Sequence, residues 1–362
     1  MTSPTTTSPG SLAVMPPTDL DVGPQLQVDD EMPSRGKAFV RSATPWAVLV
    51  GTRLIRLVVV VLLVSLATLA MLDALPGGPV DAILGPEATP EQVQIMEERL
   101  GLDKPFLERY GDWLSGIVNG DLGRSTFTQE EVSTIIKQRI PVTLQLAIGT
   151  LIVALLLAIP SAVYAAAHPG GWFDRTVSIV GSAMISIPGF VLALLLIYLL
   201  AVEFRVFPVL GWVPLTEDVG ENFKYAFLPI MSLALYEAAI FVRLLRNDML
   251  ATLQEDYILA ARARGLPRRR VLFGHALRPS CFSLITVAGV VLGRLIGGTV
   301  IVETLFVLPG LGQTAIQAIT TRDFIVLRGV IVVVCIGYVV INTLVDLAYP
   351  LLDPRVRAAK AS

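Results

Sequence analysis

The chain has 362 residues, of which 54% are hydrophobic and only 16% are charged, and its formal net charge is −2. Soluble domains carry about 25% charged residues, so the composition excludes an ordinary soluble protein and predicts an integral membrane protein. The two cysteines, Cys281 and Cys335, both lie in apolar stretches and there are only two histidines, so neither a disulfide framework nor a metal site is expected.

Residues 1–44 are rich in Thr, Ser, Pro and Asp and contain almost no aromatic residue. Such a segment cannot bury enough apolar surface to fold, so we expect a disordered cytoplasmic tail. It is not a secretory signal, because no apolar core with a cleavage site lies near Met1. Basic residues before the first apolar stretch predict a cytoplasmic N-terminus; they are Arg35, Lys37, Arg41, Arg53 and Arg56.

Residues 45–362 are expected to form one all-α transmembrane domain. Six stretches are apolar and close to the roughly 20 residues that a helix needs to cross a bilayer; they cover about 54–74, 140–167, 176–202, 227–245, 281–302 and 325–347. Pro160 predicts a kink in the second stretch, and Pro188 with Gly189 interrupts the third. Glycines in the fifth stretch predict close helix packing; they are Gly289, Gly293, Gly297 and Gly298.

The segments between these stretches divide by charge. Residues 75–139 are acidic and are expected outside the cell, with helical spacing at 90–100 and at 106–118. Residues 203–226 are also expected outside and carry aromatic side chains suited to the membrane interface; a role in gating the outer mouth is the alternative. Residues 303–324 are expected to be external or partly re-entrant. Three basic residues predict a cytoplasmic C-terminus: Arg355, Arg357 and Lys360.

The loop at 248–280 is the most informative part of the chain. Its core is EDYILAARARGLPRRRVLFGHALRP at residues 255–279. An arginine at the membrane centre costs about 2.5–3.5 kcal/mol, so this segment lies outside the bilayer, and the positive-inside rule places it in the cytoplasm. Its arginines are Arg262, Arg264, Arg268, Arg269, Arg270 and Arg278.

The same loop contains signals for two short helices. Asp256 suits the cap of a first helix of about two turns, and Gly265 suits the left-handed position that ends one. Pro267 is placed at the first position of a second helix, which runs towards Leu277. Small side chains in the first helix permit close approach by another protein; they belong to Ala260, Ala261 and Ala263.

Leu259, Ala260 and Ala261 are followed by three residues and then by Gly265. This spacing resembles the EAA motif of ABC-importer permeases, which reads Glu-Ala-Ala, three residues and Gly, with leucine here in place of glutamate. The wider wording of the loop is similar to the first-subunit type of the oligopeptide/dipeptide/nickel permease family. LGLDKPFLERYGDWLSGIVNGDLGRS in the external segment and VETLFVLPGLGQ after the fifth stretch are also similar to that family. The resemblance extends from about Leu54 to Arg357.

The resemblance implies a type I ABC-importer permease fold with six transmembrane helices in a bacterial inner membrane. It implies a permease subunit that takes up peptides delivered by an external substrate-binding protein, with nickel or another small solute as the alternative cargo. The expected partners are a second homologous permease, which forms a heterodimer with this chain, and two ABC ATPase subunits that bind ATP and Mg. No cofactor in this chain and no nucleic-acid partner are expected.

In this family the loop forms a coupling helix that docks into a groove on the ATPase. The residues expected to do so are Asp256, Tyr257, Ala260, Ala261, Arg262, Arg264, Gly265 and Leu266. The sequence contains no GxxxxGK[ST] phosphate loop, so the chain is not expected to be an enzyme and its energy must come from a partner. The rival hypothesis is an ion-coupled secondary transporter, against which stand the long loop and the lack of a repeat between the two halves.

Two charges lie inside predicted spans. Glu237 is near the middle of the fourth and Arg294 is in the outer half of the fifth, at similar depth. Intramembrane charges usually pair or face a wet cavity. One hypothesis is that both line the translocation path, where Glu237 meets the ammonium end of a peptide and Arg294 its carboxylate. The alternative is a structural ion pair between neighbouring helices.

Overall fold

The computed structural model describes residues 51–52, 55–70, 80, 84–85, 88–100 and 103–352. The chain divides into two units, Met1–Gly51 and Thr52–Ser362, and the helices described below belong to the second. The tail predicted at 1–44, Arg53 and the basic C-terminal residues lie outside the described residues. Apart from one isolated bridge between Arg124 and Glu131, the regular structure of the described residues is helical.

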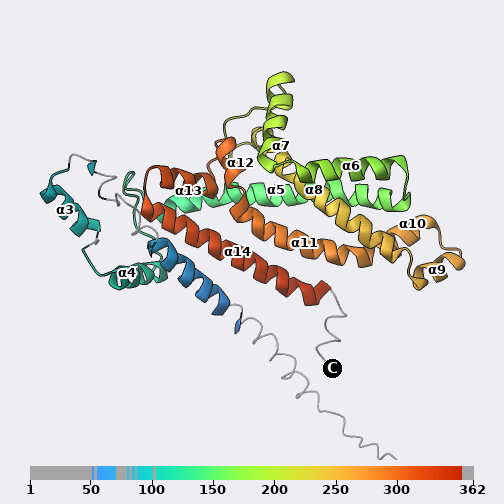
Figure 1. Cartoon of the computed structure of the whole chain (residues 1–362), viewed down its shortest axis with the longest axis horizontal. Coiled ribbons are helices and arrows are strands. Elements are labelled where there is room, and N and C mark those ends of the chain that lie inside the picture. Colours follow the sequence, from blue (N-terminus) through green and yellow to red (C-terminus); the bar gives the residue numbers. More distant parts are fainter. Residues whose placement is uncertain are drawn as a thin grey trace, which may run out of the picture. The chain divides into compact units, whose positions relative to one another are not determined.

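Four helical runs in the described part of the chain are long and apolar enough to cross a membrane. Two of them are α5 (Val132–Ala167) and α8 (Val219–Thr252), and a third, Phe324–Val345, lies within α14 (Phe324–Leu352). The fourth, Arg268–Gly298, ends in α11 (Leu277–Gly298). Figure 1 shows α5, α8, α11 and α14 running alongside one another. At about 1.5 Å per residue the 36 residues of α5 extend about 54 Å, so this helix projects well beyond a hydrocarbon core of about 30 Å.

The third predicted span is two helices at nearly a right angle. Helix α6 covers Trp172–Ser186, α7 covers Gly189–Leu196, and a π-helical turn continues α7 over Ile197–Glu203. The bend between the two parts is 108°. Its cause is Pro188, which pushes the preceding residue, Ile187, into extended conformation at φ −86° and ψ 127°. Figure 1 shows α7 turned away from α6.

The described residues do not establish the expected count of six spans. Four helices meet the length and hydropathy of a span, and the bent pair Trp172–Ser186 and Gly189–Glu203 makes a fifth if it counts as one. The first predicted span corresponds to a shorter apolar helix, Ile55–Ala70, whose flanking residues lie outside the described part of the chain.

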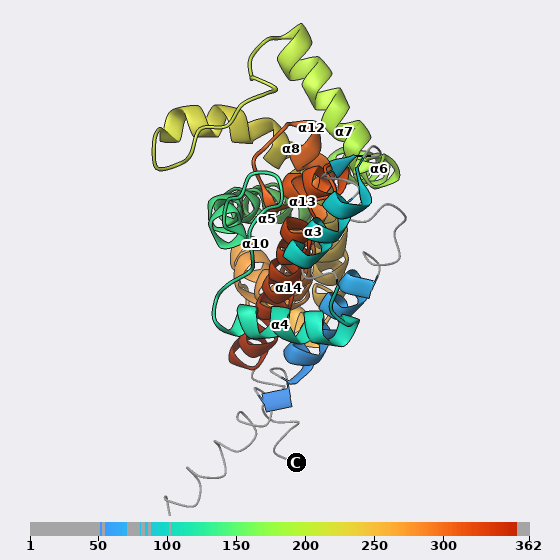
Figure 2. The ribbon, with the colours of Figure 1, turned by 90° about the vertical axis from the view of Figure 1, so that its left-hand side faces the viewer.

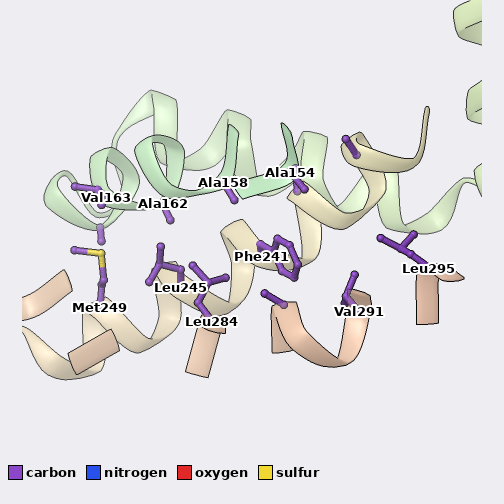
Figure 3. Packing of buried hydrophobic residues seen from close by; sticks show 14 of the residues in the cluster. Ala154, Ala158, Ala162, Val163, Phe241, Leu245, Met249, Leu284, Val291 and Leu295 are labelled. Carbon is purple, nitrogen blue, oxygen red and sulfur yellow. The ribbon is translucent and has the colours of Figure 1, made fainter. Parts of the chain in front are cut away.

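A stripe of alanines on α5 allows α8 to pack closely against it. Alanines four residues apart share one face of a helix, and those on α5 are fully buried. Small side chains at a helix contact let the backbones approach, which is how apolar helices associate in a membrane. Figure 3 shows the stripe facing α8, with α11 on the other side of α8. The labelled side chains include Ala154, Ala158 and Ala162 of α5, Phe241 and Leu245 of α8, and Leu284 and Val291 of α11.

Two of the four glycines in the fifth predicted span lie at a close helix contact. A Cβ atom on Gly289 would lie 2.4 Å from Cγ1 of Val345 on α14, and one on Gly293 would lie 2.9 Å from Nδ2 of Asn342. A Cβ on Gly297 would make an ordinary 3.5 Å contact with α14, and one on Gly298 would meet nothing within 4 Å. The prediction of close packing is therefore correct for the first two positions and wrong for the last two.

The segment predicted to be external contains α3 (Pro90–Leu100) and α4 (Phe106–Val118), as its helical spacing predicted. Helix α4 contacts the first apolar helix, Ile55–Ala70, and the last one, α14. The hydroxyl of Tyr110 lies 2.9 Å from the carbonyl of Leu62 and 2.9 Å from Oγ of Ser65 in the first apolar helix. The guanidinium of Arg328 on α14 lies 4.5 Å above the ring of Trp113. Figure 2 shows α4 crossing α14.

Candidate functional site

The arginine-rich loop begins with α9, Asp256–Ala263. The residue at the N-cap is Glu255, whose side chain makes no capping hydrogen bond, and Asp256 is the first helical residue. The prediction that Asp256 caps this helix is therefore wrong by one position. An acidic side chain in the first turn is still favourable, because the helix dipole is positive at that end.

Gly265 ends α9 in the left-handed conformation that the sequence predicted, at φ +77°. Its N–H donates to the carbonyl of Arg262 over 2.9 Å, and the N–H of Leu266 donates to the carbonyl of Ala261 over 3.3 Å. These two bonds form a Schellman motif, which satisfies carbonyls at the end of a helix. A Cβ atom on Gly265 would meet nothing within 4 Å, so glycine is required by the backbone conformation and not by crowding.

The second helix of the loop is the beginning of the fifth apolar helix. Helix α10 covers Arg268–Arg270, and Pro267 lies at its N-cap, one residue earlier than predicted. It continues through a π-helical turn, Val271–Ala276, into α11, so Arg268–Gly298 is one run of 31 residues. The predicted boundary between a loop at 248–280 and a span at 281–302 is therefore not a break in the helix. At about 1.5 Å per residue the run extends about 46 Å.

One face of α9 is exposed and the other anchors it to the protein. Ile258 is fully buried and Ala261 is 7% exposed, so Ala261 packs inwards and does not offer a docking surface. Ile258 lies three residues before Ala261, which is the helical spacing that could have identified it. Six predicted coupling residues are exposed and Leu266 is partly exposed; the exposed ones are Asp256, Tyr257, Ala260, Arg262, Arg264 and Gly265.

A cavity of about 560 Å³ lies between this loop and the C-terminal ends of α5 and α8. Arg262, Leu266 and Arg268 line it from the loop side, and Ala167 lines it from α5. Nη2 of Arg268 donates a hydrogen bond to the carbonyl of Ala167, the last residue of α5. The last carbonyls of a helix have no partner within it, so a basic side chain is well placed there. The contact ties the loop to α5.

A buried ion pair holds the turn between α5 and α6 against α8. Nε and Nη2 of Arg246 donate to the two carboxylate oxygens of Asp174 over 2.5 and 2.8 Å. The N–H of Gly170 donates to the same carboxylate over 2.9 Å. The side chain of Asp174 is only 4% exposed. Sequence reasoning missed this pair, because its members are 72 residues apart and lie on different helices.

The two intramembrane charges are in contact. Nη2 of Arg294 donates to Oε1 of Glu237 over 2.6 Å. The side chain of Glu237 is 5% exposed and that of Arg294 is 53% exposed, so one member is buried and the other is accessible. The second carboxylate oxygen of Glu237, Oε2, is buried without a hydrogen-bond partner among the described residues. Arg294 also lines a shallow cavity of about 280 Å³ with Val60 and Tyr338.

Within the described residues no group of three His, Cys, Asp or Glu side chains is placed to hold a metal ion. Cys281 and Cys335 are both free and partly buried. The candidate site is therefore an exposed basic segment joined to a helix that carries an accessible arginine. Such an arrangement can transmit movement and contact a charged solute.

Two family models of known proteins together match most of the chain. The family model described as binding-protein-dependent transport system inner membrane component matches residues 154–358, and that of its N-terminal part matches residues 47–147. The chain is 35% identical over 310 residues to a probable peptide ABC transporter permease, y4tP, of Sinorhizobium fredii, covering 86% of this chain and 99% of that one. It is 37% identical over 309 residues to a putative peptide transport system permease of Brucella abortus, covering 85% and 98%.

A nickel import system permease, NikB, of Staphylococcus aureus is 31% identical over 308 residues, which cover 84% of this chain and 90% of that one. Among solved structures, an inward-facing conformation of the MetNI methionine ABC transporter matches with a TM-score of 0.50 and 20% identity. The match covers 60% of this chain and 96% of that one. At this identity the likeness supports the fold of a type I importer permease and nothing about the cargo.

Proposed function

The chain belongs to the family of binding-protein-dependent transport system inner membrane components, and we propose that it is the peptide-translocating permease subunit of an ABC importer. As a member of that family it is a multi-pass membrane permease and not an enzyme. Peptide cargo is supported by the relatives from S. fredii and B. abortus, which are named for peptide transport and match over nearly their whole length.

The proposed assembly contains this chain, a second homologous permease, two ATPase subunits and an external substrate-binding protein. The need for separate ATPases is supported by the sequence, which contains no GxxxxGK[ST] phosphate loop to bind ATP and Mg. Both termini are proposed to lie in the cytoplasm, with residues 1–44 as a tail and 45–362 as the permease domain. That orientation rests on the arginines of the loop, which the positive-inside rule assigns to the cytoplasmic side.

The continuity of Arg268–Gly298 carries the proposal for mechanism. The ATPases would contact the exposed face of α9, with Arg262 and Arg264 as its basic residues and Leu266 beside them. Ile258 and Ala261 fix α9 to the protein, so a push on the exposed face moves the loop as a unit. Because α10 runs without a break into α11, that movement turns the helix that carries Arg294. The permease would thereby alternate between inward-facing and outward-facing states.

We further propose that Arg294 lines the translocation path and that Glu237 holds it in place. The accessible guanidinium of Arg294 can meet the carboxylate of a peptide, whereas Glu237 is buried beneath it. This arrangement combines the two hypotheses from the sequence, since the pair is structural and one member also faces the cargo. Contact between Glu237 and the ammonium end of a peptide is not supported by its burial.

Reconstitution of the complete importer tests the proposal. The permease is co-purified with the ATPases and second permease from its own cells, placed in liposomes with the binding protein, and offered a labelled oligopeptide or labelled nickel ion. We expect peptide uptake that requires both ATP and the binding protein. Uptake of nickel alone would favour the activity for which the NikB relative is named. Uptake driven by an ion gradient without ATP would contradict both.

A further inference from the structure

A short hairpin follows the outer end of α11, and we call residues 299–313 the outer hairpin. Helix α11 ends at Gly298, Thr299 forms the break, and α12 covers Val300–Leu305. A turn then leads into α13, Leu311–Thr320. This hairpin lies at the opposite end of the run Arg268–Gly298 from the arginine-rich loop, so the two ends are separated by the length of the helix.

Glu303 is the fully buried centre of the outer hairpin. Its Oε1 accepts hydrogen bonds of 2.8 Å from the hydroxyls of Thr143 on α5 and Thr299. Its Oε2 accepts one of 3.0 Å from the N–H of Gln313. The hydroxyl of Thr143 also accepts from the N–H of Leu311 over 2.9 Å, which leaves its own proton free to donate to Glu303. One carboxyl group therefore joins α5, the end of α11 and the start of α13.

None of the salt bridges between described residues involves Glu303. A buried carboxylate is costly unless hydrogen bonds satisfy it, and here neutral donors supply all of them. The donors come from segments far apart in the chain, since Thr143 precedes Glu303 by 160 residues. Any movement that separates the hairpin from α5 must break the bond from Thr143 to Glu303 and the bond from Leu311 to Thr143.

The backbone of the hairpin turn packs directly against this carboxyl group. A Cβ atom on Gly310 would lie 2.4 Å from Cδ and Oε2 of Glu303, and one on Gly312 would lie 2.9 Å from Oε2. Glycine is therefore needed at both positions for the backbone to reach the carboxylate. The sequence VETLFVLPGLGQ, noted for its wording alone, contains the acceptor and both of these glycines.

The same turn is strained. Val307 has φ +52°, a left-handed conformation that is unusual for a β-branched residue, and its side chain is 53% exposed. It occupies the position that glycine normally takes in a Schellman motif, since the N–H of Leu308 donates to the carbonyl of Glu303 over 2.8 Å. Such strain persists only where the surroundings impose it. Phe306 and Leu308, on either side, are fully buried.

We propose that Glu303 is a positioning residue that fastens the outer hairpin to α5 and so holds the outer end of the transport path closed until α11 is turned from its cytoplasmic end. This rests on the proposed function, because the driving movement is that of the coupling loop. The run Arg268–Gly298 carries the movement to the outer hairpin, and the bond between Thr143 and Glu303 resists it. The strain at Val307 favours release of the hairpin once that bond breaks.

The test uses a buried reporter in the complete importer held in nanodiscs. Leu308→Cys is introduced after Cys281→Ala and Cys335→Ala, and its reaction rate with a bulky maleimide is measured with and without ATP. Glu303→Gln keeps the shape but removes the charge: its NH₂ group would oppose the N–H of Gln313 at Oε2, and at Oε1 it can only donate to the hydroxyls of Thr143 and Thr299. We expect about a tenfold faster reaction without ATP, the size expected when hydrogen bonds to a charged group become neutral ones. Peptide transported per ATP hydrolysed falls as well.

Two further variants separate closure from simple stability. Thr143→Val removes the donor on α5 and should reproduce the faster reaction. Asp323→Asn is the matched control, since Asp323 is also buried and accepts from Ser125 and Thr126, but it ties the external segment to α14. It should lower thermal stability and leave the reaction rate of the reporter unchanged.

The result that overturns the proposal is a Glu303→Gln importer that loses only thermal stability. If its reporter rate and its ratio of transport to ATP hydrolysis match those of the parent, Glu303 has no role in closure. Should Leu308→Cys prevent folding, the ratio of peptide transport to ATP hydrolysis, measured with Leu308 unchanged, decides whether Glu303 has a role in closure. Failure of the proposed function looks different, because the unaltered importer then shows no ATP-dependent peptide uptake at all.

Discussion

Arg294 on α11 donates a hydrogen bond of 2.6 Å to Glu237 on α8, across 57 residues of sequence. The two partners are unequal, because Glu237 is buried and Arg294 is about half exposed. A buried carboxylate beneath an accessible guanidinium fixes the position of the cation while leaving donors free for another anion. The same pair therefore supports the helix contact and leaves a charged group accessible.

The first prediction concerns which member of this pair meets the peptide. Arg294→Gln should reduce uptake of peptides with a free C-terminal carboxylate by about 10- to 100-fold, the range for a hydrogen bond between charged groups. Uptake of the same peptides with an amidated C-terminus should change little. Competition uptake with matched free and amidated peptides measures the difference. An equal loss for both would show that Arg294 acts only through the structure.

The charge swap gives an independent check on the same pair. Glu237→Arg combined with Arg294→Glu places the longer side chain in the buried position, so we expect uptake to stay low. Full recovery with unchanged preference among peptides would show that the pair is a structural contact and that neither charge meets the cargo.

The second prediction concerns Gly265. Proline has φ near −65° and no N–H, so Gly265→Pro is incompatible with φ +77° and removes the bond to Arg262. We expect normal insertion, measured as permease in the membrane fraction, and no ATP-dependent uptake. Gly265→Ala should retain part of the activity, because a left-handed alanine costs about 1–2 kcal/mol. Gly274→Ala, where a Cβ meets nothing within 4 Å, is the control. Normal uptake by Gly265→Pro would remove the coupling role.

The third prediction concerns the turn between α5 and α6. Asp174→Asn and Arg246→Gln should show a coupling energy of about 1.5–3 kcal/mol in a double-mutant cycle of unfolding. We expect the lower end of that range, since Arg246 is 23% exposed and solvent screens its charge. Arg175→Gln, one residue along and exposed, serves as the control. Additive effects of the two changes would mean that the pair contributes no energy of its own.

The features that the sequence predicted well are local ones. The end of α9 at Gly265 follows from the needs of one backbone position, and the bounds of α3 and α4 follow from helical spacing. The resemblance to the peptide permease family, which rested on the ordered wording of the loop, is confirmed by the family match and by relatives that align over most of the chain.

The features that the sequence could not give depend on contacts between distant segments. Pro188 predicted a break in the third span, but the 108° angle between its two parts could not be read from the sequence. Glu303 stood in a motif that was noted without a role, because its partner Thr143 lies in another helix. Ala261 was expected on the docking surface of α9 but is buried, and only the packed structure shows which face of that helix is covered.

The last prediction concerns the contact between α11 and α14. Gly289→Ala places a Cβ atom 2.4 Å from Val345, so the helices must separate, and overpacking of this kind costs about 1–3 kcal/mol. Val345→Ala removes the two methyl groups and should restore stability to the double variant. Gly297→Ala makes only an ordinary contact at 3.5 Å and should be neutral or stabilising, because glycine inside a helix is about 0.5–1 kcal/mol less favourable than alanine. The opposite signs at two glycines of one helix distinguish packing from helix propensity. Thermal unfolding measures the stability of the purified parent permease, the two single glycine variants and the double variant. A Gly289→Ala variant as stable as Gly297→Ala would contradict the close approach of α11 and α14.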